Sequence, residues 1–161
     1  MNSKIPVVRQ INWISIIPQL VILGIIFIIW KLINIGDPFL STLVTYLIIS
    51  ISVRFLIPRD HRNGMLLVKQ EKFSEAIVYF EKSYDFFSRH NWIDKYRFVT
   101  LLSSSRMCYK EMALANIAFC YGQIGNGLKS KEYYEKTLQE YPDNGIARAG
   151  LNLINSVTNK E

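Results

Sequence analysis

The side chains that could carry acid–base, nucleophilic or metal chemistry are few in this chain and lie far apart. The two histidines are His61 and His90, and the two cysteines are Cys108 and Cys120. The sequence has no H-E-x-x-H, G-x-S-x-G, P-loop or C-x-x-C motif, which would hold such groups at a fixed spacing. We therefore expect no catalytic residue, no metal ligand and no cofactor, and we predict that the protein is not an enzyme.

The two cysteines lie twelve residues apart on one expected helix. A rise of about 1.5 Å per residue separates them by about 18 Å, whereas the Cα atoms of a disulfide lie within about 7 Å of each other. We expect two free, buried thiols, which are typical of a protein in a reducing cytosol.

Charge and hydropathy change abruptly near residue 58. The charged side chains before this point are Lys4, Arg9, Lys31, Asp37 and Arg54. Residues 59–161 carry the other fifteen basic and twelve acidic side chains, a mild positive excess without a basic stripe. The sequence thus predicts a membrane anchor at residues 1–58 and a soluble domain at residues 59–161. It indicates neither a nucleic-acid partner nor a small-molecule substrate.

Two apolar runs in the anchor are long enough to cross a bilayer, at about residues 12–33 and 38–57. Tryptophans flank the first run, and such amphipathic rings favour the headgroup region. The first run is long, no cleavage site follows it and a second run does, which favours a membrane span over a signal peptide. The residues expected at the membrane interface are Trp13, Trp30, Lys31, Arg54, Arg59 and Arg62.

Only a few residues join the two runs, so they predict a tight antiparallel hairpin. Asp37 is a credible helix N-cap and Pro38 a credible first helical residue. Basic residues before the first run (Lys4, Arg9) and at the end of the second (Arg54) place both termini in the cytoplasm by the positive-inside rule. Abundant Ile, Lys and Asn indicate an AT-rich bacterial genome. We expect an integral protein with two spans in a bacterial inner membrane.

The soluble part contains an internal repeat at an offset of 54 residues. Residues 79–83 (YFEKS) align with residues 133–137 (YYEKT). Each unit has the pattern of an apolar-periodic helix, a polar turn and a second apolar-periodic helix. The turns are expected at residues 70–72 and 125–127, where Gly125 is a natural helix C-terminal residue.

These units, at 57–90 and 111–144, resemble the tetratricopeptide repeat family, whose pattern runs W-x2-L-G-x2-Y, then A-x3-F, then P. The second unit matches at Leu114, Ile117, Ala118, Tyr121, Ser130, Tyr134 and Pro142. The first unit matches at Gly64, Leu67, Ala76 and Phe80 and departs at Asp60, Asn63 and Ser88. The resemblance implies an all-α protein with a two-helix transmembrane hairpin followed by a tetratricopeptide-like repeat domain.

Proteins that resemble this family generally bind a peptide segment in a groove lined by the first helix of each repeat. The resemblance therefore implies a protein or peptide partner. The groove candidates by position are His61, Met65, Lys69, Ala115, Asn116, Phe119 and Gln123.

An insertion at residues 91–104 separates the two units. It predicts a helix with Asn91 as its N-cap, on which Trp92, Tyr96, Val99 and Leu102 share one face. This helix either leaves the groove open or fills it. The next helix is expected from about Arg106 to Ile124 after a serine cap, and a terminal capping helix at residues 145–157.

Two functions fit this organisation. The first is a non-catalytic, membrane-anchored interaction module that acts as a scaffold or adaptor. The alternative is a structural or assembly subunit of a larger membrane complex. Its hairpin would be the main contact, through Gln19, Asn34 and the Ser/Thr face of the second span.

Overall fold

The computed structural model describes residues 13–34 and 36–158, and over these residues it is helical with no strand. A 3-10 turn at Trp13–Ser15 leads into α1 (Ile16–Ile33) and α2 (Pro38–Leu56). The remaining helices are α3 (Arg59–Lys69), α4 (Phe73–Arg89), α5 (Asn91–Lys95), α6 (Arg97–Thr100), α7 (Tyr109–Gln123), α8 (Gly127–Glu140) and α9 (Gly145–Thr158). The predicted all-α class is confirmed. The start of the first predicted span at residue 12, with Lys4 and Arg9, lies outside the described residues.

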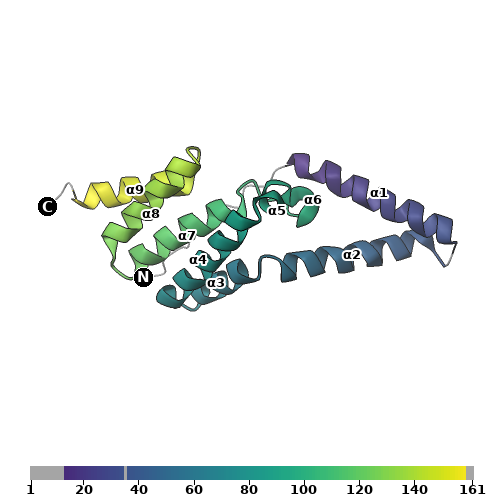
Figure 1. Ribbon diagram of the computed structural model, residues 1–161, viewed down its shortest axis with the longest axis horizontal. Helices are drawn as coiled ribbons and strands as arrows, with labels where there is room; N and C mark the ends of the chain where they lie inside the picture. Colours follow the sequence, from purple (N-terminus) through teal and green to yellow (C-terminus); the bar gives the residue numbers. More distant parts are fainter. Residues whose placement is uncertain (1–12, 35, 159–161) are drawn as a thin grey trace.

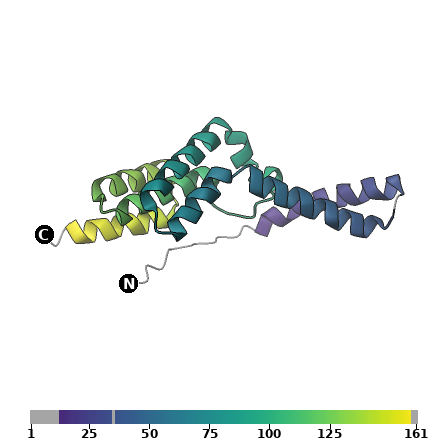
Figure 2. The same ribbon diagram turned by 90° about the horizontal axis from the view of Figure 1, so that it is seen from below.

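The hairpin of α1 and α2 projects from one end of a bundle formed by the other helices (Figures 1 and 2). Both helices are long and apolar enough to cross a membrane. Only 6% of the residues in an 18-residue stretch of α1, and 11% in such a stretch of α2, are buried in the protein. Core helices of a soluble domain would be mostly buried. The predicted N-cap is confirmed, because Asp37 Oδ1 accepts a hydrogen bond from Phe39 N at 2.9 Å.

The bundle consists of antiparallel helix pairs stacked side by side. The helix α4 packs against α3 and α7, and α8 packs against α7 and α9 (Figure 1). The turn between α3 and α4 holds Glu71 at φ 60°, and the turn between α7 and α8 holds Gly125 at φ 79°. Both left-handed residues reverse the chain at the positions that the sequence predicts.

Small residues allow the paired helices to approach closely. The site of a Cβ on Gly64 lies 2.8 Å from Phe80 Cε1, so the ring occupies the space that a side chain would need. Ser130 Oγ donates a hydrogen bond to the Ala118 carbonyl at 2.8 Å across the second pair. Phe80 and Ala118 have no exposed surface. The core lies along α4 and α7, where Phe80 packs with Val68, Ala76, Ile77, Ile117 and Cys120.

The α9 helix offers a matched test of this close packing. A Cβ on Gly150 would clash with Cε2 of the buried Tyr134 ring, whereas a Cβ on Gly145 meets nothing within 4 Å. We expect Gly150→Ala to lower the free energy of unfolding by about 2 kcal/mol through overpacking. Gly145→Ala is expected to leave it unchanged or raise it by about 0.5 kcal/mol. Chemical denaturation of the full chain in mild detergent, followed by circular dichroism, measures both. Equal effects would contradict the packing argument.

The insertion differs from the expected single helix. It forms two short helices, α5 and α6, and Asn91 is the first residue of α5 rather than its cap. Arg97 turns the chain back on itself, because its guanidinium donates to the carbonyls of Asp94, Ser105 and Arg106. The helices also lie at the hairpin end of the bundle, against α4 and α1, so they do not fill the predicted groove (Figure 1).

The start of α7 was also predicted wrongly. The helix begins at Tyr109 rather than near Arg106, and its cap is Cys108 rather than a serine. Cys108 Sγ accepts from Glu111 N at 3.4 Å, and Cys108 N donates to Glu111 Oε2 at 3.3 Å, which completes a capping box. Leu102, at φ 48°, interrupts the helical conformation between α6 and α7.

Candidate functional site

The seven predicted groove residues do not share one exposed surface. Lys69 and Gln123 are exposed, and Met65, Asn116 and Phe119 are half-buried. His61 and Ala115 are buried, with exposed fractions of 7% and 3%, so their assignment to a surface was wrong. Both residues lie on the inner side of their helices, and the His61 ring contacts Phe80 on α4 and Tyr109 on α7.

The structure does bring the first helices of the two units together. Asn116 Nδ2 on α7 donates to Met65 Sδ on α3 at 3.6 Å, and the rings of Phe73 and Phe119 meet edge-to-face at 6.1 Å. A thioether is a weak acceptor, so the Asn116 amide keeps most of its hydrogen-bonding capacity. These residues form a half-buried surface. Asn116 is its polar centre and the Phe73 and Phe119 rings are its aromatic border, and Lys69 and Gln123 extend it toward solvent.

His61 is part of the core next to this surface. Its ring lies edge-on to Phe80 at 5.4 Å and to Tyr109 at 5.3 Å. Burial lowers the pKa of His61 to about 4, so the imidazole is neutral at physiological pH. Its Nδ1 atom and Ser83 Oγ are buried without a hydrogen-bond partner. Both residues line a cavity of about 200 Å³ with Leu56, Ile57, Pro58, Arg59, Asp60, Phe86 and Phe87.

The residues predicted at the membrane interface lie near the ends of the two hairpin helices. Trp30 and Lys31 lie in the last turn of α1, where the Trp30 indole donates to Thr45 Oγ1 at 3.1 Å. Trp13 precedes α1 and is 77% exposed. The three arginines lie at or beyond the end of α2, where Arg62 donates to the Phe55 carbonyl at 2.7 Å and covers the Phe55 ring. Arg59 is exposed.

Arg54 has a contact that the sequence did not predict. Its guanidinium donates to the Leu102 carbonyl, and Gln19 Nε2 donates to the same oxygen at 3.2 Å. Tyr46 on α2 reaches Gln19 Oε1 at 3.5 Å. The loop after α6 is therefore held between the two hairpin helices. Only the polarity of Gln19 and Arg54 within apolar runs indicated that they have partners.

Asp94 is a second residue that sequence reasoning missed. It is 2% exposed, and its carboxylate accepts from Tyr109 N at 2.8 Å and from Lys110 N at 2.9 Å. It thus satisfies two free amides at the start of α7 from a different helix. Fourteen residues separate Asp94 from Tyr109, so no local capping pattern indicated this role.

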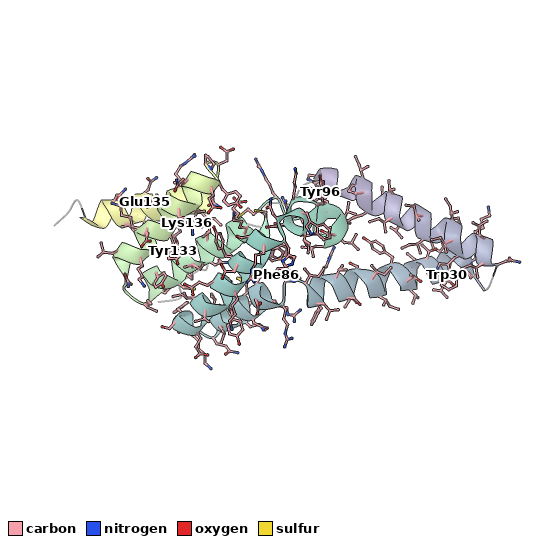
Figure 3. The ribbon with its side chains drawn as sticks, in the orientation of Figure 1. Trp30, Phe86, Tyr96, Tyr133, Glu135 and Lys136 are labelled. Atoms are coloured by element: carbon pink, nitrogen blue, oxygen red, sulfur yellow. The ribbon has the colours of Figure 1, made fainter. Side chains whose placement is uncertain are left out.

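A cluster of charged and aromatic side chains joins α4, α7 and α8. Glu140 accepts from Tyr84 OH at 2.7 Å and pairs with Lys110 at 2.8 Å, and Lys136 covers the Tyr84 ring at 4.6 Å. Burial disfavours the charged form of Glu140. The hydrogen bonds from Lys110 and Tyr84 and the nearby lysine charges outweigh burial and lower the pKa of the carboxyl. Burial and Glu140 raise the pKa of Tyr84 to about 12. Figure 3 shows Lys136 beside Tyr133 on α8.

The described residues contain no group of three or more His, Cys, Asp or Glu side chains that could hold a metal ion. The thiols of Cys108 and Cys120 are free, and burial raises the pKa of both. No protein-family model, curated protein or solved structure matches this chain.

Proposed function

We propose that this protein is a membrane-anchored interaction module, in which a two-span hairpin holds a helical repeat domain at the cytoplasmic surface of a bacterial inner membrane. In this proposal the repeat domain recruits or scaffolds another protein, and the chain itself carries out no chemistry. The observation that carries it is the surface on α3 and α7, where the Asn116 amide has only a thioether acceptor.

The resemblance to tetratricopeptide repeats supports this proposal. In both proposed units, 57–90 and 111–144, a small residue on the first helix lies against a residue of the second. Gly64 contacts Phe80, and Ala118 accepts the hydrogen bond of Ser130. The two first helices then lie on one face, which is the face that holds Met65, Asn116 and Phe119.

The junction supports a fixed pose rather than a flexible tether. Only Ile57 and Pro58 separate α2 from α3. The Leu102 carbonyl receives hydrogen bonds from α1 through Gln19 and from α2 through Arg54. A partner bound on α3 and α7 would therefore be held at a defined distance from the bilayer.

Site-specific photo-crosslinking in living cells tests the proposal. A benzophenone amino acid replaces Lys69 or Gln123, the exposed ends of the surface, and Lys82 on α4 serves as the control position. We expect crosslinks to the same protein from positions 69 and 123 and none from position 82. Asn116→Ala should weaken them about five- to tenfold, because a hydrogen bond of about 1 kcal/mol is lost.

The alternative is a structural subunit of a larger membrane complex. Three of the polar groups on which it relies already have partners, because Gln19 and Thr45 are hydrogen-bonded within the chain and Thr42 donates to the Pro38 carbonyl. A crosslinker at Leu47, 58% exposed on α2, reports on this reading. Crosslinks from position 47 that persist in Asn116→Ala, with none from positions 69 and 123, would favour the subunit over the adaptor.

A further inference from the structure

The segment of α5 and α6 presents an apolar surface that no other residue in the described part of the chain covers. Trp92 is 60% exposed, Tyr96 56% and Val99 51%. Tyr96 N donates to the Trp92 carbonyl and Val99 N to the Tyr96 carbonyl, so the three residues follow one another by one turn each across the break between α5 and α6. Tryptophan and tyrosine combine a large apolar body with a polar tip, the combination that is enriched at membrane–water interfaces.

This face lies level with the end of the hairpin. The helix α6 packs against α1, and the Leu102 carbonyl that follows it is hydrogen-bonded by Gln19 and Arg54, which both belong to the apolar helices. Figure 3 shows Trp30 near the turn of the hairpin and Tyr96 at its opposite end, beside the start of α1. The segment that carries the exposed side chains therefore lies against the hairpin, at the end where α1 begins.

Side chains of the segment lie within hydrogen-bonding distance of several of its own backbone carbonyls. Arg97 donates to the carbonyls of Asp94 and Ser105 at 3.2 and 3.0 Å. Thr100 Oγ1 lies 2.7 Å from the Ile93 carbonyl and 3.1 Å from the Tyr96 carbonyl. A free carbonyl costs several kcal/mol in hydrocarbon, so these bonds make the segment compatible with a medium of low polarity.

The charges around the face fit an anionic surface. Asp94 is the one acidic residue between positions 91 and 106, and its carboxylate is buried against α7. Lys95 is exposed, and its ammonium lies 5.7 Å from the Tyr96 ring. Arg89 and Arg106 at the two ends of the segment are also exposed. Cations near an anionic leaflet contribute roughly 1 kcal/mol each.

We propose that α5 and α6 form an interfacial foot, in which Trp92, Tyr96 and Val99 insert into the headgroup region of the leaflet on the repeat-domain side. The foot is a third membrane contact in addition to the two spans, and it fixes the tilt of the repeat domain. This inference rests on the proposed membrane anchor, so its test reports on the two separately.

Quenching of single tryptophans in vesicles tests the foot. The full chain is reconstituted into phosphatidylcholine–phosphatidylglycerol vesicles that contain lipids brominated near the top of the acyl chain. One variant, Trp13→Phe with Trp30→Phe, leaves Trp92 as the reporter. A second, Trp13→Phe with Trp92→Phe, leaves Trp30 as the reporter of the hairpin. A third replaces all three tryptophans with Phe and carries Leu128→Trp, at a position that is 87% exposed at the far end of α7 and α8.

We expect the brominated lipid to quench Trp92 and Trp30 and aqueous iodide to quench only the tryptophan at position 128. Quenching of Trp92 by iodide to the same extent as position 128 would overturn the foot. Shielding of Trp92 from both quenchers would also overturn it and indicate a protein occupant, such as a second copy. If Trp30 escapes the brominated lipid, the anchor itself is refuted. Subtracting the emission of Trp92→Phe from that of the unmodified chain gives the Trp92 signal with the hairpin unaltered.

Discussion

Replacing Asp94 with alanine is expected to lower the free energy of unfolding by about 3 kcal/mol, because two buried backbone amides lose a charged acceptor at once. The Asp94 carboxylate binds Tyr109 N and Lys110 N at 2.8 and 2.9 Å and is 2% exposed. These amides start α7, the helix that packs against both α4 and α8. Loss of this cap therefore acts on the centre of the bundle.

Chemical denaturation of the full chain in mild detergent, followed by circular dichroism, measures this effect. Asp94→Asn keeps an oxygen acceptor without the charge, so we expect an intermediate loss of about 1 to 2 kcal/mol. Asp85→Ala is the control. Asp85 is exposed on α4, so its substitution removes a carboxylate without removing a cap. If Asp94→Ala were no more destabilising than Asp85→Ala, the carboxylate would not contribute to the stability of α7.

The elements that the sequence predicted well are those encoded locally. The hairpin helices follow from long apolar runs, and Asp37 followed by Pro38 sets the start of α2 within one residue. The first turn lies at residues 70–72 as predicted, and the second, predicted at residues 125–127, lies at residues 124–126; both follow from polar and glycine residues between periodic segments. In each case the physical cause lies within a few residues of its effect, so a single sequence contains it.

The features that were missed depend on contacts between distant residues. Asp94 acts on amides fifteen and sixteen residues further along the chain, and Gln19 contacts a carbonyl 83 residues away. Cys108 is an uncommon cap, and the side-chain bonds of Arg97 end α6 early. No periodicity or capping rule encodes these contacts. The groove prediction failed at His61 and Ala115 for the same reason, because both are buried and the His61 ring packs against Phe80 on α4 and Tyr109 on α7.

Because His61 is buried, we expect the protein to lose stability in mild acid. Burial lowers the pKa of His61 from 6.5 in the unfolded chain to about 4 in the fold. Between these values the unfolded chain binds the proton and the folded chain does not, so stability falls as the pH falls from about 6.5 to about 4. A difference of about 2.5 pKa units corresponds to a total of roughly 3 kcal/mol, and this contribution is fully present only above the unfolded pKa.

His61→Phe is expected to remove this pH dependence and to keep the stability at neutral pH within about 1.5 kcal/mol of the parent, because an aromatic ring of similar size remains between Phe80 and Tyr109. The loss of an unpartnered buried nitrogen offsets part of any packing cost. Denaturation curves at pH values from 7 down to 4.5 measure the slope, with His90→Gln at the exposed histidine as the control.

Measurements above pH 4.5 separate the titration of His61 from that of Glu140. Glu140 has a pKa lowered from 4.5, so the stability that it contributes is present above that value and is lost only as the pH falls further. A slope between pH 6.5 and 4.5 that disappears in His61→Phe and persists in His90→Gln therefore belongs to His61. A slope that survives in His61→Phe would show that the imidazole is protonated as readily in the fold as in the unfolded chain. The helix pair around Phe80 would then be open to water at the membrane end.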